Sequence, residues 1–162
     1  MADLHRAYLN IGSNIQPEAN LPRAVEMLRA HGQLRAVSQA WETHAVGSDG
    51  PNFLNLCALF LTPLSAGDLK AEVINPIEDQ LGRIRSADRN APRTLDLDIA
   101  LYDDTPLHLS NWDSAFLLVP LAELAPDLPH PVTGEPLRKA AQRALHETWI
   151  IPRPDVIAAA RT

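Results

Sequence analysis

The stretch APRTLDLDIALYD, residues 91–103, alternates two carboxylates with large aliphatic side chains. Side chains i and i+2 of a strand point to the same face, so a strand here would bury the aliphatic residues and present Asp96 and Asp98 together. The two carboxylates would then lie roughly 7 Å apart or somewhat less. In a helix the aspartates would diverge by roughly 200°, and the aliphatic residues would share no face. We therefore predict a strand, whose aliphatic positions are Leu95, Leu97 and Ile99.

The whole chain has the size and composition of one folded domain, which we assign to residues 1–162. It is 46% hydrophobic and 21% charged, with a net charge of −6. This acidic balance argues against a general nucleic-acid or membrane-surface binder. No apolar run approaches the ~20 residues of a membrane helix, and the N-terminus lacks the features of a signal peptide. The single cysteine, Cys57, lies in an apolar run, so we expect a buried thiol and a cytoplasmic protein.

Outward from residues 91–103, the sequence pattern predicts an α+β domain with a ferredoxin-like βαββαβ core. Its sheet would be mainly antiparallel, with both helices packed on one face. A C-terminal helical extension would follow this core. Strands are expected at 6–11, 33–44 and 53–62, and helices at 20–32 (Asn20 as N-cap, Gly32 as stop), 65–81 (bent at Pro76, or with its first part ending there), 120–124 and 135–147.

Four arginines fall within the eleven residues 83–93, directly before the acidic pair. Guanidinium groups suit phosphate oxygens, and two carboxylates on one strand face can bind Mg²⁺ together with waters and substrate phosphates. This combination favours phosphoryl or pyrophosphoryl transfer from a nucleoside triphosphate. Two alternatives stay open: the arginines could form surface salt bridges, and the aspartates could be the solvated face of an edge strand. The arginines are Arg83, Arg85, Arg89 and Arg93.

The motif APRTLDLDI, residues 91–99, resembles the signature GPRTLDLDI of the 6-hydroxymethyl-7,8-dihydropterin pyrophosphokinase family. Members of that family transfer the β,γ-pyrophosphate of ATP to the hydroxymethyl group of the pterin and release AMP, with two Mg²⁺ ions at the triphosphate. The resemblance implies the same activity here, as a step of folate biosynthesis. Four further segments are similar to the family in form and order: YLNIGSN (8–14), PNFLN (51–55), IEDQLGRIR (77–85) and FLLVPLAELAPDL (116–128).

The resemblance implies a metal and phosphate site around the acidic pair. Asp96 and Asp98 would hold both Mg²⁺ ions, and Asp96 lies where it could take the proton of the acceptor hydroxyl. Arg83 and Arg93 would contact the phosphates and support the transfer. Further positions that match the family near the nucleotide are Glu78, Arg85 and His108.

For the pterin, the resemblance implies an aromatic sandwich of Phe53 and Phe116, because flat heteroaromatic rings stack well on phenyl faces. Asn55 would hydrogen-bond the edge of the pterin, since a side-chain amide both donates and accepts. Backbone groups around Thr43 and Val46 would complete that edge. The alternative is that both phenylalanines are ordinary core residues.

The chain departs from the family pattern on the nucleotide side. Ser114 stands where the family has an arginine, and Asn90 where a loop tryptophan is common. His108 keeps the family position, so His130 of the segment LPHP is interpreted as a turn residue. These changes predict weaker ATP binding or a slower closed state. They keep two alternatives open: a paralogue that acts on another pterin alcohol, and a non-catalytic pterin- or nucleotide-binding protein. As partners we expect the pterin and ATP, with no nucleic acid and no membrane, and we expect a monomer.

Overall fold

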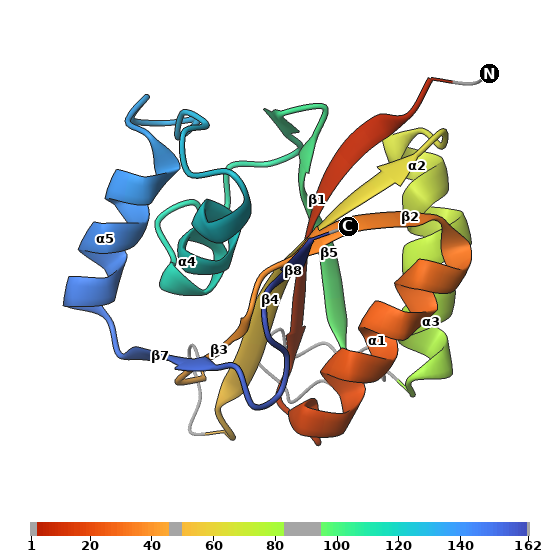
Figure 1. Ribbon diagram of the computed structural model, residues 1–162, viewed down its shortest axis with the longest axis horizontal. Helices are drawn as coiled ribbons and strands as arrows, with labels where there is room; N and C mark the ends of the chain where they lie inside the picture. The colour runs from red at the N-terminus through yellow and green to blue at the C-terminus, as the bar shows by residue number, and fades with distance from the viewer. Residues whose placement is uncertain (1–2, 46–49, 83–94, 162) are drawn as a thin grey trace.

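The computed structural model describes residues 3–45, 50–82 and 95–161. Within these ranges an antiparallel sheet of eight strands runs through the molecule, with helices on both faces (Figure 1). The strand order is β6-β5-β1-β4-β2-β8, while β3 pairs with β4 and β7. The expected α+β class with a ferredoxin-like, mainly antiparallel core is confirmed. The strands are β1 (His5–Ser13), β2 (Gln33–Val37), β3 (Ala40–Thr43), β4 (Phe53–Thr62), β5 (Asp96–Tyr102), β6 (Thr105–Pro106), β7 (Ile150–Arg153) and β8 (Ala160–Arg161).

The segment expected as one strand at 33–44 forms two strands, β2 and β3, so that prediction is wrong. Ser38 lies between them. Its amide donates to the carbonyl oxygen of Cys57 (2.8 Å), and its hydroxyl accepts from the Cys57 amide (2.9 Å). The serine side chain thus replaces a backbone acceptor of the ladder, and both short strands stay paired to β4.

Helix α1 (Pro17–His31) begins a turn earlier than predicted, so the interpretation of Asn20 as its N-cap is wrong. A proline suits the first turn because that turn leaves its N–H groups without helical partners anyway. Asn20 is buried inside the helix, and its side-chain amide donates to the carbonyl oxygen of Ile15 at 2.6 Å. This bond ties the first turn to the preceding loop. Gly32 follows the last helical residue, as predicted.

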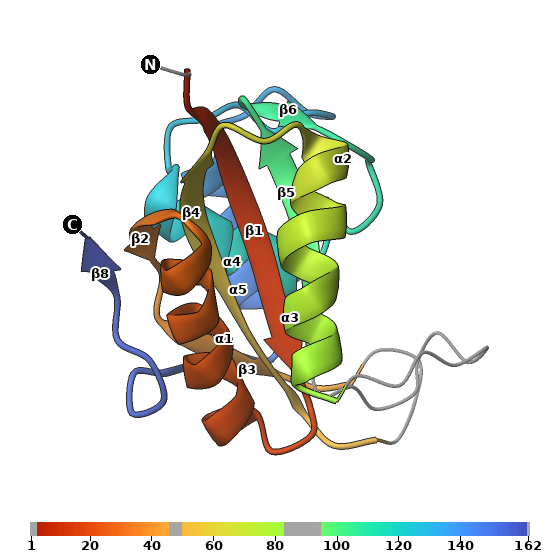
Figure 2. The ribbon, with the colours of Figure 1, turned by 90° about the vertical axis from the view of Figure 1, so that its right-hand side faces the viewer.

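The helix predicted at 65–81 is confirmed as a continuous helical segment made of α2 (Ala66–Leu69), the π-helical η1 (Lys70–Ile74) and α3 (Asn75–Gln80). In the π turn the amide of Asn75 bonds to the carbonyl oxygen of Lys70, five residues back. Pro76 follows at once. It has no N–H, and its ring crowds the carbonyl four residues earlier, so a widened turn accommodates it. Helices α1 and α3 cover the same face of the sheet (Figure 2).

The C-terminal extension covers the opposite face with α4 (Ala115–Leu124) and α5 (Leu137–Glu147) (Figure 1). The prediction of a short helix at 120–124 is wrong, because α4 begins at Ala115 and contains Pro120. All residues from Leu117 to Leu121 are buried, and this burial outweighs the bond that the proline cannot make. In the described part of the chain, no helix has the length and apolar character needed to cross a membrane.

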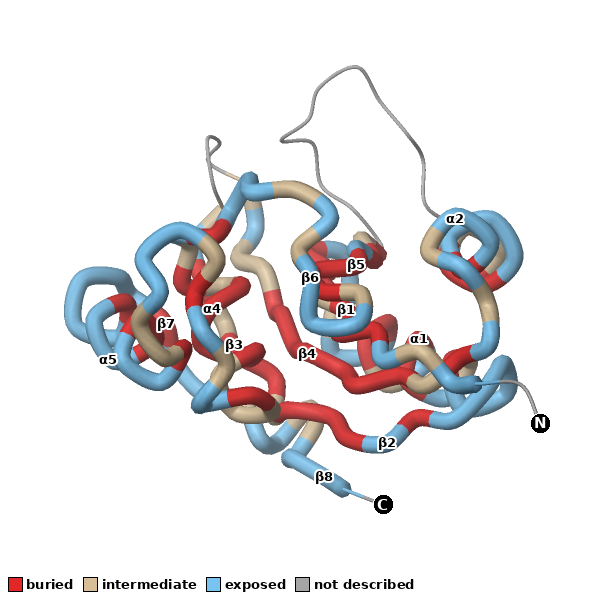
Figure 3. The backbone as a smooth tube through the Cα atoms, turned by 90° about the horizontal axis from the view of Figure 1, so that it is seen from above, coloured by how far each residue is buried: buried red, intermediate tan, exposed pale blue. Residues whose placement is uncertain are grey.

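Two buried clusters lie on the two faces of the sheet, and Figure 3 shows the buried backbone of the central strands between them. The first cluster, under α1 and α3, contains Leu97 and Ile99 of β5. The second, under α4 and α5, contains Trp112 and Cys57, whose burial was predicted. Because β5 alternates, Asp96 and Asp98 face the second side.

Candidate active site

The acidic pair is carried by β5, at the level where this strand pairs with β1. Asp96 lies opposite Gly12, and Asp98 lies opposite Asn10. Leu97 is buried between the two aspartates, while the Asp98 side chain is 50% exposed. The predicted alternation is therefore confirmed. It leaves two carboxylates on one face of a rigid strand, and at least Asp98 is open to a ligand.

The buried carboxylate of Glu78, on α3, accepts a hydrogen bond from the backbone amide of Leu97 at 2.9 Å. That amide lies between the two aspartates and points away from β1, where β5 would otherwise have an open edge. This bond therefore fixes the position of β5 relative to α3. The resemblance to the family placed Glu78 near the nucleotide, and no sequence pattern predicted this contact.

The side chain of His108 contacts Asp98 of the acidic pair. Its Nε2 lies 2.9 Å from Oδ2 of Asp98, and its Nδ1 lies 2.8 Å from the hydroxyl of Ser110. The His108 side chain is 38% exposed, so a ligand can reach it. A carboxylate predicted to bind metal and a residue predicted to contact the nucleotide thus lie side by side, and both are partly exposed.

Asn10 adds an acceptor beside Asp98. Its Oδ1 is buried, and among the described residues it has no hydrogen-bond partner. Buried acceptors are nearly always satisfied, so such an oxygen indicates an unseen donor or cation. In the described ranges no three His, Cys, Asp or Glu side chains gather into a metal site. The set of two carboxylates and one amide oxygen fits Mg²⁺, which takes oxygen ligands and commonly completes its shell with water and phosphate.

The residues expected to bind the pterin lie on the neighbouring strands of the same face. Asn55 of β4 is buried and pairs with Gly12 of β1. A Cβ on Gly12 would lie 2.6 Å from the Asn55 Oδ1, so the amide lies across the glycine, toward the side where β1 pairs with β5. Thr43 is buried and pairs with Phe53. The structure therefore brings Asn55 and the acidic pair together.

Phe53 and Phe116 are both only partly buried. Phe53 is the first residue of β4, and Phe116 is in the first turn of α4, which packs against β4. Phe116 touches the margin of the second cluster without being one of its buried members. Partial exposure of both residues leaves them accessible for stacking on a ligand.

Several predicted positions fall in the remaining parts of the chain. Arg83, Arg85, Arg93 and Val46 lie outside the described residues, as does Asn90. Ser114, which replaces the family arginine, immediately precedes α4, and its carbonyl oxygen accepts from the Leu118 amide at 3.0 Å. Two residues were not singled out for the site by the sequence: Asn10, and Trp112, whose indole bonds to the backbone of His108.

Residues 8–126 match the sequence model of the family described as 7,8-dihydro-6-hydroxymethylpterin-pyrophosphokinase (HPPK). The chain belongs to the HPPK family. An HPPK relative, the 2-amino-4-hydroxy-6-hydroxymethyldihydropteridine pyrophosphokinase of Methylorubrum extorquens, is 39% identical over 147 residues, which cover 83% of this chain and 90% of that protein. The enzyme of the same name from Pseudomonas aeruginosa is 36% identical over 137 residues, covering 77% and 83% of the two chains.

Other HPPK matches are parts of larger polypeptides. The folic acid synthesis protein fol1 of Schizosaccharomyces pombe is 36% identical over 149 residues, which are 85% of this chain but only 20% of that protein. The crystal structure of Plasmodium falciparum HPPK-DHPS with pteroate superposes with a TM-score of 0.67 at 12% identity, covering 89% of this chain and 43% of that one. At this identity the superposition supports the HPPK fold alone.

Proposed function

We propose that this protein transfers pyrophosphate from ATP to the hydroxymethyl group of 6-hydroxymethyl-7,8-dihydropterin and releases AMP, a step of folate biosynthesis. Membership of the HPPK family supports the reaction. The observation that carries it for this chain is the arrangement of Asp96 and Asp98 on one strand face, with His108 bonded to Asp98 and Asn55 two strands away. One face thus offers a metal and phosphate end and a pterin end.

At the pterin end, the partly exposed rings of Phe53 and Phe116 would stack on the two faces of the heterocycle. Asn55 would read its polar edge, because its amide can donate and accept at once. The backbone around Thr43 and Val46 would complete this edge. The absence of a side chain at Gly12 keeps room for the Asn55 amide.

At the phosphate end, Asp96 and Asp98 would hold two Mg²⁺ ions, with Asn10 as an additional oxygen beside Asp98. Bound Mg²⁺ supplies charge neutralisation for the triphosphate. Arg83 and Arg93 would contact the transferred phosphates. The nucleotide group is completed by Arg85, His108 and Glu78, of which Glu78 would act through its bond to Leu97.

The reaction itself is an in-line displacement. The pterin hydroxyl oxygen bonds to the β-phosphorus of ATP as the bond from that phosphorus to the α-phosphate oxygen breaks, and AMP leaves. The proton of the hydroxyl must be taken up during this step. Asp96 is the candidate acceptor, because it lies nearer than Asp98 to the row of β1 and β4 that carries Asn55.

We also propose that the protein works as a monomer in a reducing cytoplasm. Cys57 supports the reducing compartment, since it is buried without a disulfide partner and burial raises the pKa of its thiol. Light scattering after size-exclusion chromatography tests the monomer. A mass of twice 17.8 kDa would contradict it.

The decisive experiment mixes the purified protein with Mg²⁺, ATP and 6-hydroxymethyl-7,8-dihydropterin and follows AMP by chromatography. Wild type should form AMP, and Asp98→Asn should lower the rate by about a hundredfold or more, because it removes a metal-binding charge. Asp104→Asn is the matched control, since Asp104 is exposed in the β5–β6 turn at φ 63°, which asparagine tolerates. No AMP while calorimetry still detects pterin binding would favour another pterin alcohol or a binding role.

A further inference from the structure

A chain of hydrogen bonds runs from the turn before α5 to the acidic pair. His130 Nε2 lies 2.5 Å from the carbonyl oxygen of Trp112. The Trp112 indole N–H donates to the carbonyl oxygen of His108 at 3.0 Å. The His108 ring then meets Asp98 at 2.9 Å. Three contacts therefore connect a turn of the C-terminal extension to the proposed metal site.

The partners of His130 fix the state of its ring. A carbonyl oxygen only accepts, so Nε2 must donate to Trp112. Nδ1 accepts from the amides of Val132 and Thr133, at 3.1 and 3.2 Å, so it carries no proton. Both ring nitrogens thus have hydrogen-bond partners, and His130 is only 7% exposed. His130 is more than a turn residue, because it joins its own turn to a segment eighteen positions earlier.

The turn that carries His130 is itself anchored. The His130 amide donates to the carbonyl oxygen of Glu135 at 2.7 Å, and the His130 carbonyl oxygen accepts from Gly134 at 2.9 Å. The Leu137 amide, at the start of α5, donates to the carbonyl oxygen of Leu128 at 2.9 Å. The His130 ring therefore projects from a turn whose backbone is held by hydrogen bonds.

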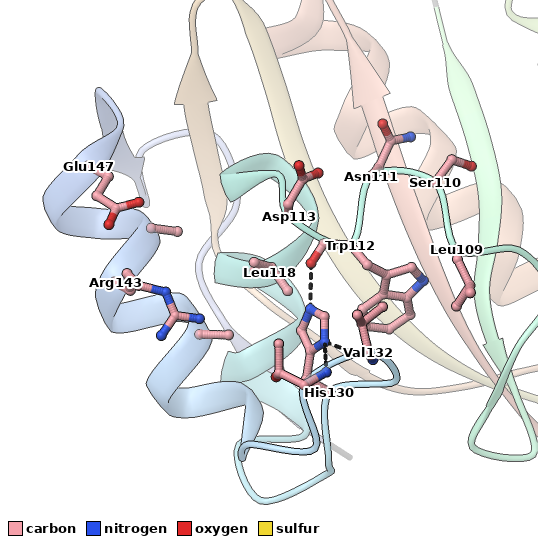
Figure 4. A pocket seen from close by; sticks show the side chains of 13 residues that line it. Leu109, Ser110, Asn111, Trp112, Asp113, Leu118, His130, Val132, Arg143 and Glu147 are labelled. Carbon is pink, nitrogen blue, oxygen red and sulfur yellow. Dashed lines mark hydrogen bonds between the residues drawn. The ribbon is translucent and has the colours of Figure 1, made fainter.

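The segment 109–113, by contrast, borders a cavity on one side. It forms one wall of this cavity, which has a volume of about 540 Å³ and whose opposite wall includes Arg143 and Glu147 of α5 (Figure 4). Figure 4 shows the His130 ring bonded to Trp112 beside this cavity. Because a cavity offers no packing atoms, the position of the segment depends on its hydrogen bonds and on the buried Trp112 ring.

We propose that His130 and Trp112 are positioning residues of the nucleotide site, which hold His108 in place beside Asp98. This inference rests on the proposed function through the role of His108 with ATP. In this role neither residue needs to touch the substrates. Loss of their bonds would let the His108 backbone shift, and ATP binding would weaken, while pterin binding at Asn55, two strands from Asp98, would not.

Two substitutions of His130 separate its two bonds. His130→Asn keeps an acceptor near Nδ1 for the turn amides but is too short to reach Trp112. His130→Gln keeps a donor near Nε2 and loses the acceptor. Trp112→Phe removes the indole N–H and preserves most of the ring. Thr133→Ala is the matched control, because it removes a bond within the same turn, to the Glu135 amide, and leaves the link to Trp112 intact.

Steady-state kinetics gives the first readout. His130→Asn and Trp112→Phe should raise KM for ATP about three- to tenfold, the factor expected for one lost hydrogen bond, with KM for the pterin unchanged. His130→Gln should raise it less, and Thr133→Ala not at all. In a His108→Ala background, His130→Asn should add no further effect. Equal changes in both KM values, a larger effect of His130→Gln, or full additivity with His108→Ala would overturn the proposal.

A second readout does not need activity. The imidazole ¹⁵N shifts of His108 report its tautomer and hydrogen bonding. They should change in His130→Asn and Trp112→Phe, and remain as in wild type in Thr133→Ala. Unchanged His108 shifts in all variants would refute the proposed positioning of His108. If wild type forms no AMP while these shifts respond as expected, the positioning of His108 is supported and the proposed reaction fails.

Discussion

Gly12 and Asn55 face each other across β1 and β4 so closely that a Cβ on the glycine would lie 2.6 Å from the asparagine Oδ1. Carbon and oxygen atoms do not approach to this distance, so the amide can keep its place only over a glycine. The amide is buried, and this contact fixes where its polar atoms point. The segment YLNIGSN thus contributes to the proposed pterin site because Gly12 has no side chain.

Gly12→Ala should therefore weaken pterin binding more than it weakens the fold. The new methyl group meets the end of a movable side chain, so the free energy of unfolding should fall by less than about 1 kcal/mol. The displaced amide should cost one or two hydrogen bonds, or about tenfold in the pterin dissociation constant. Calorimetry with the pterin measures this. Gly67→Ala, where a Cβ meets nothing within 4 Å, is the control, and unchanged affinity in Gly12→Ala would show that Asn55 does not read the pterin.

Glu78→Ala should destabilise the protein by about 1–3 kcal/mol, because it leaves the Leu97 amide without its buried acceptor. Glu78→Gln keeps a carbonyl oxygen at that position and should cost less. Urea unfolding measures both values. The exposed Glu72, in the same helical segment, provides the control Glu72→Ala, with an expected change within about 0.5 kcal/mol. Equal losses for the two Glu78 variants would assign the effect to the charge of the carboxylate, because glutamine preserves both the side-chain volume and a carbonyl acceptor.

The ion pair of Glu42 and Arg153 predicts a pH-dependent stability. The hydrogen bonds from Asn52 and Arg153 lower the pKa of Glu42. A carboxyl whose folded-state pKa is depressed stabilises the fold fully above its unfolded pKa of about 4.3, and this stabilisation is lost as the pH falls through the folded value. Arg153→Ala should therefore cost about 1 kcal/mol at pH 7 and less at pH 3.

Denaturation of both proteins at the two pH values tests this. The control is Arg29→Ala, because Arg29 meets Glu26 at the exposed surface of α1 and such pairs contribute little. A cost of Arg153→Ala that is the same at pH 3 and pH 7 would assign the effect to the aliphatic stem of the arginine and not to its charge.

Ser114→Arg should tighten the binding of Mg²⁺ and a non-hydrolysable ATP analogue by about tenfold, since a phosphate–guanidinium bond contributes roughly 1.5–3 kcal/mol. The same change places a cation at the N-terminal end of α4, where the helix dipole disfavours it, so stability should fall by about 0.3–1 kcal/mol. Ser114→Gln, of comparable reach and no charge, is the control. Equal affinity in the arginine and glutamine variants would argue that Ser114 does not face the nucleotide.

The sequence predicted those features that depend on local alternation. The period of two in TLDLDI determined which side chains of β5 are buried, and the same rule placed the acidic pair correctly. The chain of βαββαβ elements followed from similar periodicities. Ser38 was not recognised as an interruption, because its effect depends on the amide of Cys57 on another strand. Asn20 was assigned as an N-cap from its residue type, although Pro17 offers an earlier start.

The contacts that organise the site were beyond local patterns. The bond of Glu78 to Leu97 joins positions on a helix and a strand that the chain brings together only in three dimensions. The bond of His130 to Trp112 connects two turns, and neither turn has a repeating pattern from which their proximity could be inferred. The resemblance to the family identified His108 but not the residues that support it.

The pairing of β3 with β7 joins residues 40–43 to residues 150–153. A ribosome adds about 5–20 residues per second, so β3 is made roughly 5–20 s before its partner. During this interval the outer edge of β3 displays unpaired backbone groups, which attract other extended chains. Synthesis of this protein therefore contains an aggregation-sensitive period, and slow codons between residues 44 and 149 would lengthen it.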